Sequence, residues 1–211
     1  MSKNVMVIGT GTIGEPLIGL LAEHKDALGL EEILFFKRTP LSDEKGKVEA
    51  LLRKGAKIVS TSDVISDFKK LGFSDIEDVE KAYKDAGVII DCTPSGNENW
   101  ENIYSTLDQS KRFMAQGSEH GFGPFFAWGI NNDVLENGSN KYLIASCNTH
   151  NIASIIKTFA LDQSRELVEG QFVCLRRAND VSQNESFSPS PTITKHSNQE
   201  FGTHHARDVH E

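Results

Sequence analysis

The N-terminal stretch Val5-Met6-Val7-Ile8-Gly9-Thr10-Gly11-Thr12-Ile13-Gly14 decides the fold of this chain. Its first four residues form a short apolar run, which is typical of a strand buried within a parallel sheet, and Gly9 ends that run. Apolar residues then recur at helical spacing from Ile13 to His24. The order of strand, glycine-rich turn and helix predicts the first half of a βαβ unit.

The same alternation continues along the chain. Further buried strands are expected at 33–36, 57–60, 88–90 and 112–115, and helices at 44–54 and 75–85. Ser74 is the expected cap of the helix at 75–85, because acidic residues fill the first turn after it. Strands that alternate with helices through short connections predict an α/β fold with a doubly wound parallel sheet.

After Lys141 the pattern restarts with an expected strand at 142–145, a helix at 151–160 and a strand at 169–176. Residues 178–211 differ in character, because they carry few large apolar side chains among many Ser, Asn, Gln and His. Such a stretch cannot close a core by itself. We therefore expect a long loop there, or the beginning of a domain whose remainder is absent.

Composition and charge limit the classes of partner. The chain has 211 residues, with 22 basic and 30 acidic side chains and a formal net charge of −8. This balance argues against a nucleic-acid or anionic-membrane partner, and no apolar run approaches the length of a membrane span. The N-terminal apolar run is also too short for a signal peptide. Three widely spaced cysteines, Cys92, Cys147 and Cys174, indicate reduced thiols in a cytoplasmic protein.

Residues 9–14 fit the pattern G-x-G-x-x-G between a strand and a helix, which is the context that makes this pattern informative. Gly9 permits the tight turn, Gly11 lets a pyrophosphate approach the backbone, and Gly14 lets the helix pack close to the strand. The N–H groups at the helix start face the phosphates. We favour dinucleotide binding over the alternative that the glycines only make a turn.

The end of the second strand bears on the type of dinucleotide. A carboxylate at that point binds a free ribose 2′-hydroxyl, whereas a basic residue accommodates a 2′-phosphate. Here the strand runs into Lys37 and Arg38, and the first acid is Asp43. The pattern favours NADP and leaves NAD open. A basic pair that is simply solvated is the alternative interpretation.

Cys147 is a candidate nucleophile, since it lies between Ser146 and Asn148 at an expected strand-to-helix turn. A thiolate is favoured at a helix N-terminus, and local N–H groups with Asn148 can hold an oxyanion. The alternative for Cys147 is a small buried apolar residue, which we also expect for Cys92 and Cys174. His150 shares a helical face with Cys147, and its alternative is a plain surface histidine.

The chain resembles the archaeal-type (type II) phosphorylating glyceraldehyde-3-phosphate dehydrogenases, which are enzymes of glycolysis and gluconeogenesis. The resemblance runs from the N-terminus to the last residue and rests on short motifs in a fixed order. These are Gly-Thr-Gly-Thr-Ile-Gly at 9–14, Lys-Arg-Thr-Pro at 37–40, Asp-Cys-Thr-Pro-Ser-Gly at 91–96, Gln-Gly-Ser-Glu at 116–119, Ser-Cys-Asn-Thr at 146–149, Arg176-Arg177 with Asp180, and His204-His205 with Asp208-Val209.

The resemblance implies a chemistry for these residues. The thiolate of Cys147 adds to the aldehyde of glyceraldehyde 3-phosphate, hydride passes to the nicotinamide of NADP or NAD, and inorganic phosphate releases the thioester as an acyl phosphate. Beside the three glycines, the residues implied to bind the cofactor are Thr12, Ile13, Lys37, Gly117 and Arg177. The residues implied to contact substrate are Ser146, Asn148, His204 and His205.

Length is the main departure from the resemblance, because members of the family are much longer than this chain. We expect a Rossmann-type nucleotide domain over 1–145 and an incomplete α+β catalytic domain over 146–211. The general base of the family would then be missing, and only His150, His204 or His205 could replace it. The family's tetramer is expected for the full-length protein, and the chain as given is expected to be inactive if no histidine substitutes.

The residues leave three alternatives to this function open. The chain is a nucleotide-binding fragment without catalysis, or a related cysteine-dependent semialdehyde dehydrogenase or acyl-phosphate reductase. A metal site at His204, His205, Asp208 and His210 is conceivable, but the spacing is unlike that of metal ligands, and we expect none.

Overall fold

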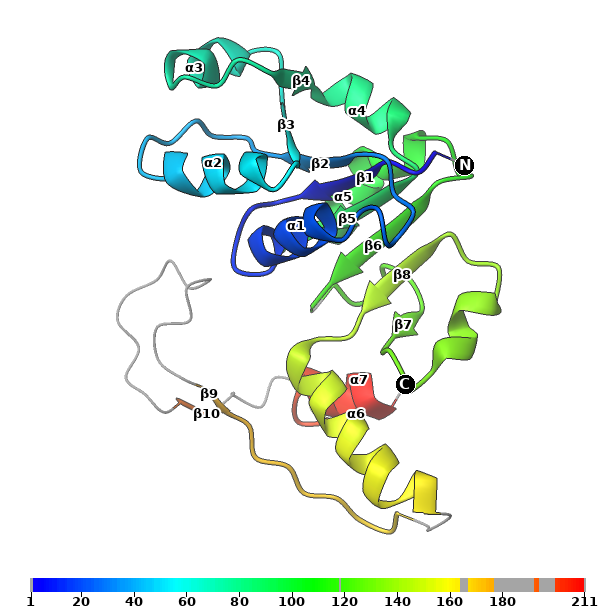
Figure 1. Ribbon diagram of the computed structural model, residues 1–211. Coiled ribbons are helices and arrows are strands. Elements are labelled where there is room, and N and C mark those ends of the chain that lie inside the picture. The colour runs from blue at the N-terminus through cyan, green and yellow to red at the C-terminus, as the bar shows by residue number, and fades with distance from the viewer. Residues whose placement is uncertain (1, 118, 164–166, 177–191, 194–199, 211) are drawn as a thin grey trace. The chain divides into compact units, whose positions relative to one another are not determined.

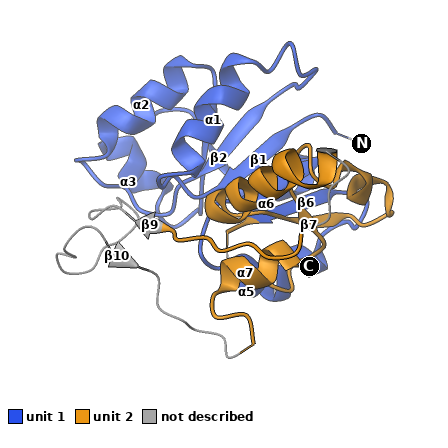
Figure 2. Ribbon diagram, turned by 90° about the horizontal axis from the view of Figure 1, so that it is seen from below, with its two compact units in different colours: residues 1–115 blue, residues 116–211 orange. Residues whose placement is uncertain are grey.

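The computed structural model describes residues 2–117, 119–163, 167–176, 192–193 and 200–210. The chain divides into two compact units, unit 1 at residues 1–115 and unit 2 at residues 116–211, which are coloured blue and orange in Figure 2. This division concerns compactness, and the domain boundary expected at residue 145 stays a prediction.

Unit 1 alternates strands with helices, as Figure 1 shows from its blue to its green segments. Its strands are β1 Val5–Ile8, β2 Ile33–Phe36, β3 Lys57–Ser60, β4 Ile76–Asp78, β5 Val88–Asp91 and β6 Arg112–Gln116. Its helices are α1 Gly14–Glu23, α2 Lys45–Arg53, α3 Ile65–Lys70, α4 Val79–Asp85 and α5 Gly96–Asn102, followed by the 3-10 turn η1 Tyr104–Thr106.

The strands of unit 1 lie in the order β4-β3-β2-β1-β5-β6, and each neighbouring pair is parallel. The chain builds outward from β1 to β4 and then returns to place β5 on the other side of β1. The carboxyl ends of β1 and β5 therefore form a topological switch point, where ligands bind in open α/β sheets. The predicted doubly wound α/β fold is confirmed.

Alternate residues of the strands serve two apolar layers, since successive side chains of a strand point to opposite faces. One layer joins the sheet to α1, α2 and α3, and its buried members include Val7, Ile18, Phe35, Leu51, Ile58 and Phe68. On the opposite face, the ring of Tyr104 lies 5.8 Å from that of Phe113 and 6.2 Å from that of Tyr83. Burial on both faces explains why the strands read as continuous apolar runs.

The turn between β1 and α1 requires glycine at two positions. Gly9 has a φ of +94°, a left-handed conformation that side chains disfavour. A Cβ on Gly14 would lie 2.0 Å from the carbonyl oxygen of Gly9, so that a larger residue cannot occupy this position without moving the backbone. The close approach of helix to strand predicted from the glycine pattern is thus present.

The prediction of a helix over 75–85 is wrong for the first turn. Ile76–Asp78 forms the edge strand β4, in which Ile76 pairs with Ile58 of β3, and α4 begins only at Val79. The cap is Asp78 instead of Ser74, because the Asp78 carboxylate accepts the Glu80 N–H at 2.9 Å. Pairing with a neighbouring strand outweighs the local acidic pattern here. Helix α3 was not predicted from the sequence.

Unit 2 contains short strands and two further α-helices. The elements are β7 Phe125–Phe126, η2 Asn132–Glu136, β8 Lys141–Ile144, α6 Cys147–Phe159, η3 Leu161–Gln163, β9 Leu175–Arg176, β10 Thr192–Ile193 and α7 His204–His210. Strands β7 and β8 pair in parallel, whereas β9 and β10 pair antiparallel.

Three expectations for unit 2 need correction. The strand expected at 169–176 is confined to Leu175–Arg176, because residues 167–174 have no regular structure. Helix α6 begins at Cys147, one turn earlier than expected. Helix α7 forms inside the segment expected to be a loop, and residues 177–191 and 194–199 of that segment lie outside the described residues.

Within the part of the chain that the structure describes, no helix has the length and apolar character needed to span a membrane.

Gly14→Ala tests the contact between α1 and β1. The added methyl would overlap the Gly9 carbonyl, so we expect the free energy of unfolding to fall by about 2 kcal/mol or more. Gly11→Ala is the control, because a Cβ there meets no atom within 4 Å, and its effect should stay within about 0.5 kcal/mol. Urea unfolding followed by circular dichroism measures both values, and equal stabilities would contradict the steric argument.

Candidate functional site

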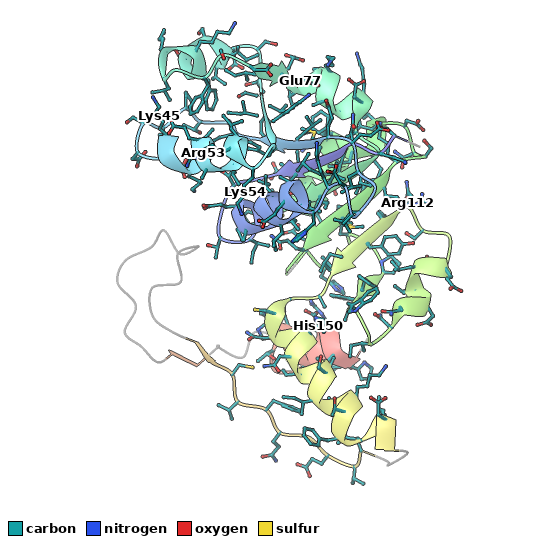
Figure 3. The ribbon with its side chains drawn as sticks, viewed as in Figure 1. Lys45, Arg53, Lys54, Glu77, Arg112 and His150 are labelled. Atoms are coloured by element: carbon teal, nitrogen blue, oxygen red, sulfur yellow. The ribbon has the colours of Figure 1, made fainter. Side chains whose placement is uncertain are left out.

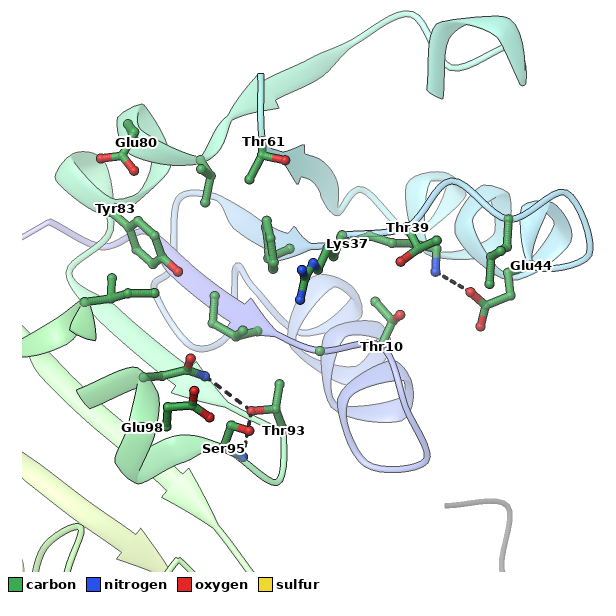
Figure 4. A pocket seen from close by; sticks show the side chains of 18 residues that line it. Thr10, Lys37, Thr39, Glu44, Thr61, Glu80, Tyr83, Thr93, Ser95 and Glu98 are labelled. Atoms are coloured by element: carbon green, nitrogen blue, oxygen red, sulfur yellow. Dashed lines mark hydrogen bonds and ion pairs between the residues drawn. The ribbon is translucent and has the colours of Figure 1, made fainter. Parts of the chain in front are cut away.

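A pocket of about 570 Å³ opens at the carboxyl ends of the strands of unit 1 (Figure 4). It lies where the switch point of the sheet predicts a ligand. The residues that line it follow β1, β2, β3 and β5 or come from α4 and α5. They are Ile8, Gly9, Thr10, Phe36, Lys37, Arg38, Thr39, Leu41, Glu44, Thr61, Val79, Glu80, Tyr83, Thr93, Ser95, Glu98, Asn99 and Ile103.

Lys37 is held at the edge of this pocket. Its side chain is only 6% exposed, and its Nζ donates to the carboxylate of Glu44 (Figure 4). The alternative of a solvated basic pair is therefore wrong for Lys37, whereas Arg38 is exposed. No carboxylate directly follows β2, and Glu44 reaches the pocket from the start of α2.

Asp91 organises the wall of the pocket next to β1. It is 1% exposed, and its two carboxylate oxygens accept hydrogen bonds from Tyr104 Oη at 2.8 Å, Asn99 Nδ2 at 2.7 Å and the Thr93 hydroxyl at 2.6 Å. Burial, together with the negative charge of Asp91, raises the pKa of Tyr104 far above its usual range, so this phenol stays a donor. Asp91 thereby fixes Thr93 and Asn99, which line the pocket.

The glycine turn presents its predicted residues in different ways. Gly9 lines the pocket, and Gly14 is buried beneath it. Gly11, Thr12 and Ile13 are exposed at the tip of the turn, with open space at the Cα of Gly11. An exposed backbone before a helix start is the arrangement that binds a pyrophosphate.

Two predicted cofactor residues lie outside unit 1. Gly117 follows β6 with a φ of +76°, and its N–H donates to the carbonyl of Ile144 at 3.3 Å. Arg177 lies outside the described residues. Their part in cofactor binding stays a prediction.

Cys147 is the first residue of α6 and is exposed, which excludes the alternative of a buried apolar residue. The preceding Ser146 caps the helix, because its Oγ accepts the Thr149 N–H at 3.3 Å. The thiol therefore lies beside the N–H groups of a capped helix N-terminus, where negative charge is favoured.

His205 of α7 packs against this helix start. Its Nε2 lies 3.3 Å from Asn148 Nδ2, and its Nδ1 lies 3.3 Å from Ser146 Oγ and 3.4 Å from Thr149 Oγ1. Because an amide nitrogen only donates, the contact with Asn148 is a hydrogen bond in the tautomer of His205 that carries its proton on Nδ1. The structure thus brings His205 together with both neighbours of Cys147.

The adjacent His204 is half-buried, and its ring lies 3.8 Å from that of His205. His150, labelled on α6 in Figure 3, donates from Nε2 to the carbonyl of Trp128 at 3.0 Å. This exposed hydrogen bond agrees with the alternative of a surface histidine, and a role for His150 beside Cys147 stays a prediction. Of the three histidines, His205 is the one that contacts Ser146 and Asn148, and His204 lies against its ring.

The other two cysteines differ from Cys147. Cys92 is half-buried at the end of β5, where burial and the charge of Asp91 raise the pKa of its thiol to about 12. Cys174 is half-buried just before β9, not inside a strand as expected. Among the described cysteines, the one whose surroundings favour reactivity is Cys147.

Asp208 is buried on α7. Its Oδ1 accepts hydrogen bonds from Nε and Nη2 of Arg207, at 3.1 and 2.7 Å. Its Oδ2 is buried without a hydrogen-bond partner among the described residues. Within the same described part of the chain, no group of three or more His, Cys, Asp or Glu is arranged to hold a metal ion.

Comparison with curated proteins bears on this pair of sites. The chain is 27% identical to a glyceraldehyde-3-phosphate dehydrogenase of Pyrobaculum calidifontis, 29% identical to that of Sulfolobus acidocaldarius and 28% identical to that of Sulfurisphaera tokodaii. The chain is similar to archaeal glyceraldehyde-3-phosphate dehydrogenases. Each of these alignments covers 97% of this chain and 57% of the relative. No protein-family profile matches the chain.

The resemblance that the motifs indicate is therefore confirmed, and it extends through both units. The chain spans less than three fifths of these relatives, at 57% of their length. The likeness covers the strands and turns that build the pocket and the helix that begins at Cys147. The roles of the individual residues stay predictions.

Sequence reasoning missed several residues that shape the two sites. Asp91 was quoted only as part of a motif, although its place directly after a strand at the switch point was a usable signal. Thr149 lies three residues after the helix cap Ser146, and this capping distance could have predicted the hydrogen bond between them. Glu44 lies seven residues after Lys37, and no pattern in the sequence shows that their side chains meet.

Asp91→Ala should damage both the fold and the pocket. Removal of the carboxylate leaves Tyr104 and Asn99 without their acceptor, and we expect about 3 kcal/mol of destabilisation. Asp85→Ala is the matched control, because Asp85 is an exposed partner of Lys81 and should cost less than about 0.5 kcal/mol. Thermal and urea unfolding compare the two variants, and a similar loss in both would refute this assignment.

Proposed function

We propose that the protein is an NADP-dependent phosphorylating glyceraldehyde-3-phosphate dehydrogenase. The observation that carries the proposal is the exposed thiol of Cys147 at the capped start of α6, whose two chain neighbours both contact His205. The likeness to archaeal relatives bearing that name supports the reaction, because it continues through this segment.

The pocket of unit 1 fits a dinucleotide. Gly14 has no room for a Cβ, Gly9 has the positive φ of a tight turn, and Gly11 leaves the turn open to a phosphate. Lys37 and Arg38 supply positive charge where a ribose 2′-phosphate would lie, which supports NADP over NAD. When bound, this cofactor supplies a hydride acceptor.

The residues of α6 and α7 would act on the aldehyde. The Cys147 thiolate forms a bond to the carbonyl carbon, and the Asn148 amide with nearby N–H groups stabilises the oxyanion. After the carbon has lost its hydride, a thioester remains on the sulfur. Inorganic phosphate then attacks the thioester carbon, the acyl phosphate leaves, and the thiolate is restored.

His205 and His204 have different parts in this proposal. The buried ring of His205 positions Ser146 and Asn148 through its two nitrogens. His204 is half-buried and supplies a cationic or donor group for the phosphate of the substrate. We propose a cytoplasmic protein that forms homotetramers.

A direct assay tests the function. The protein, mixed with glyceraldehyde 3-phosphate, inorganic phosphate and NADP, should produce NADPH, measured by absorbance, and omission of phosphate should stop sustained turnover. Aspartate semialdehyde and acetaldehyde serve as competing substrates. Saturable NADP binding with no NADPH formed from any aldehyde would instead support a nucleotide-binding protein without catalysis.

Cys147 should be the thiol that iodoacetamide modifies first. The Cys147 thiol is exposed and open to the reagent, whereas the raised pKa of Cys92 keeps that half-buried thiol protonated at pH 8. Mass spectrometry of briefly treated protein measures the modified sites. Cys147→Ser should abolish NADPH formation, and Cys174→Ser, which also removes a thiol from unit 2, should retain it. Full turnover in Cys147→Ser would end the proposal.

A further inference from the structure

Glu44 places one carboxylate against two ammonium groups at the edge of the pocket. Its Oε2 accepts from Lys37, as the dashed line in Figure 4 marks, and its Oε1 accepts from Lys47 Nζ at 2.8 Å. Glu44 precedes α2 directly but makes no side-chain bond to the N–H groups of that helix. The side chain at this position often caps the helix, but the Glu44 carboxylate binds the two lysines instead.

Lys47 connects Glu44 with the glycine turn. Lys47 Nζ also donates to the carbonyl of Thr10 at 3.2 Å and lies 3.7 Å from the carboxylate of Glu15 in the first turn of α1. The hydrogen bonds from Lys37 and Lys47 lower the pKa of Glu44, so the carboxylate is charged at neutral pH. Glu44 therefore connects the expected ribose end of the pocket with its expected pyrophosphate end.

Glu44 competes with any second anion for the ammonium group of Lys37. Its side chain is 6% exposed, so its ammonium group has little freedom to turn away. A 2′-phosphate and a carboxylate on one ammonium group repel each other at close range. A 2′-hydroxyl is neutral and can donate to the carboxylate without breaking the ion pair.

We propose that Glu44 determines how strongly this pocket distinguishes a ribose 2′-phosphate from a 2′-hydroxyl. Binding of the 2′-phosphate displaces the Glu44 carboxylate from Lys37, and Lys47 retains it. The displacement weakens the preference for NADP that Lys37 creates and keeps NAD usable. The inference rests on the proposed function, since it requires that the pocket bind the adenosine half of a nicotinamide dinucleotide.

Two nucleotides that differ only in the 2′-phosphate test this role. Adenosine 2′,5′-bisphosphate and AMP are titrated into the protein and followed by calorimetry. Glu44→Gln should strengthen binding of the bisphosphate about tenfold, because Lys37 loses its competing anion, and should change AMP binding less than about twofold. The ratio of the two affinities is the quantity that decides.

Glu49→Gln is the matched control. Glu49 lies on the same helix, does not line the pocket, and is 3.8 Å from Lys45 and 4.0 Å from Arg53, both labelled in Figure 3. This variant removes one negative charge from α2 as Glu44→Gln does at its edge, so it measures the general effect of net charge. We expect its affinity ratio to equal that of the unmodified protein.

A double-variant cycle guards against a purely structural effect. In Lys37→Gln the bisphosphate should lose its advantage over AMP, and adding Glu44→Gln to that variant should then leave the ratio unchanged. The inference would be overturned if Glu44→Gln still increased the affinity ratio in the Lys37→Gln variant. It would also be overturned if Glu44→Gln alone left the ratio unchanged while both nucleotides bind. Failure of the unmodified protein to bind either nucleotide would overturn the proposed function itself, and the inference with it.

Discussion

The contact between Gly14 and the carbonyl of Gly9 is the constraint on which unit 1 depends. Because no Cβ intervenes, the first turn of α1 approaches the end of β1 closely enough to aim its N–H groups across the carboxyl edge of the sheet. The parallel order of the strands then sets the end of β5 beside that turn. The beginning of the glycine turn and the neighbouring strand ends thus share one pocket.

Two buried charged side chains at that pocket, Asp91 and Lys37, are each stabilised by polar partners. The buried carboxylate of Asp91 accepts hydrogen bonds from several neutral donors, which compensates for its loss of hydration. Lys37 is equally buried and is compensated by Glu44. The first carboxylate is held by neutral donors, whereas the second belongs to an ion pair for which, as we propose, an anionic ligand competes. Asp91 therefore has a structural role beside the pocket, whereas the Lys37–Glu44 pair is the site where we propose that the pocket distinguishes between ligands.

Much of this arrangement was predictable from sequence, and the failures have a common cause. The buried strands and the glycine turn depend on local apolar runs and on backbone sterics, which a sequence displays directly. The edge strand β4 was missed because its identity depends on pairing of Ile76 with Ile58, which lies far away in the chain. Helix α7 was missed because its buried side chains include His205 and Asp208, so it has no apolar periodicity.

The sequence by itself determined the doubly wound α/β class, the glycine turn and the position of Cys147 at a helix start, since each depends on neighbouring residues. Only the tertiary structure decided which polar groups meet. It brought His205 to Asn148 over a separation of 57 positions, and it paired Lys37 with Glu44. Those contacts arise where separate elements pack together, and the free energy that selects them comes from burial and hydrogen bonding between elements that no local pattern encodes.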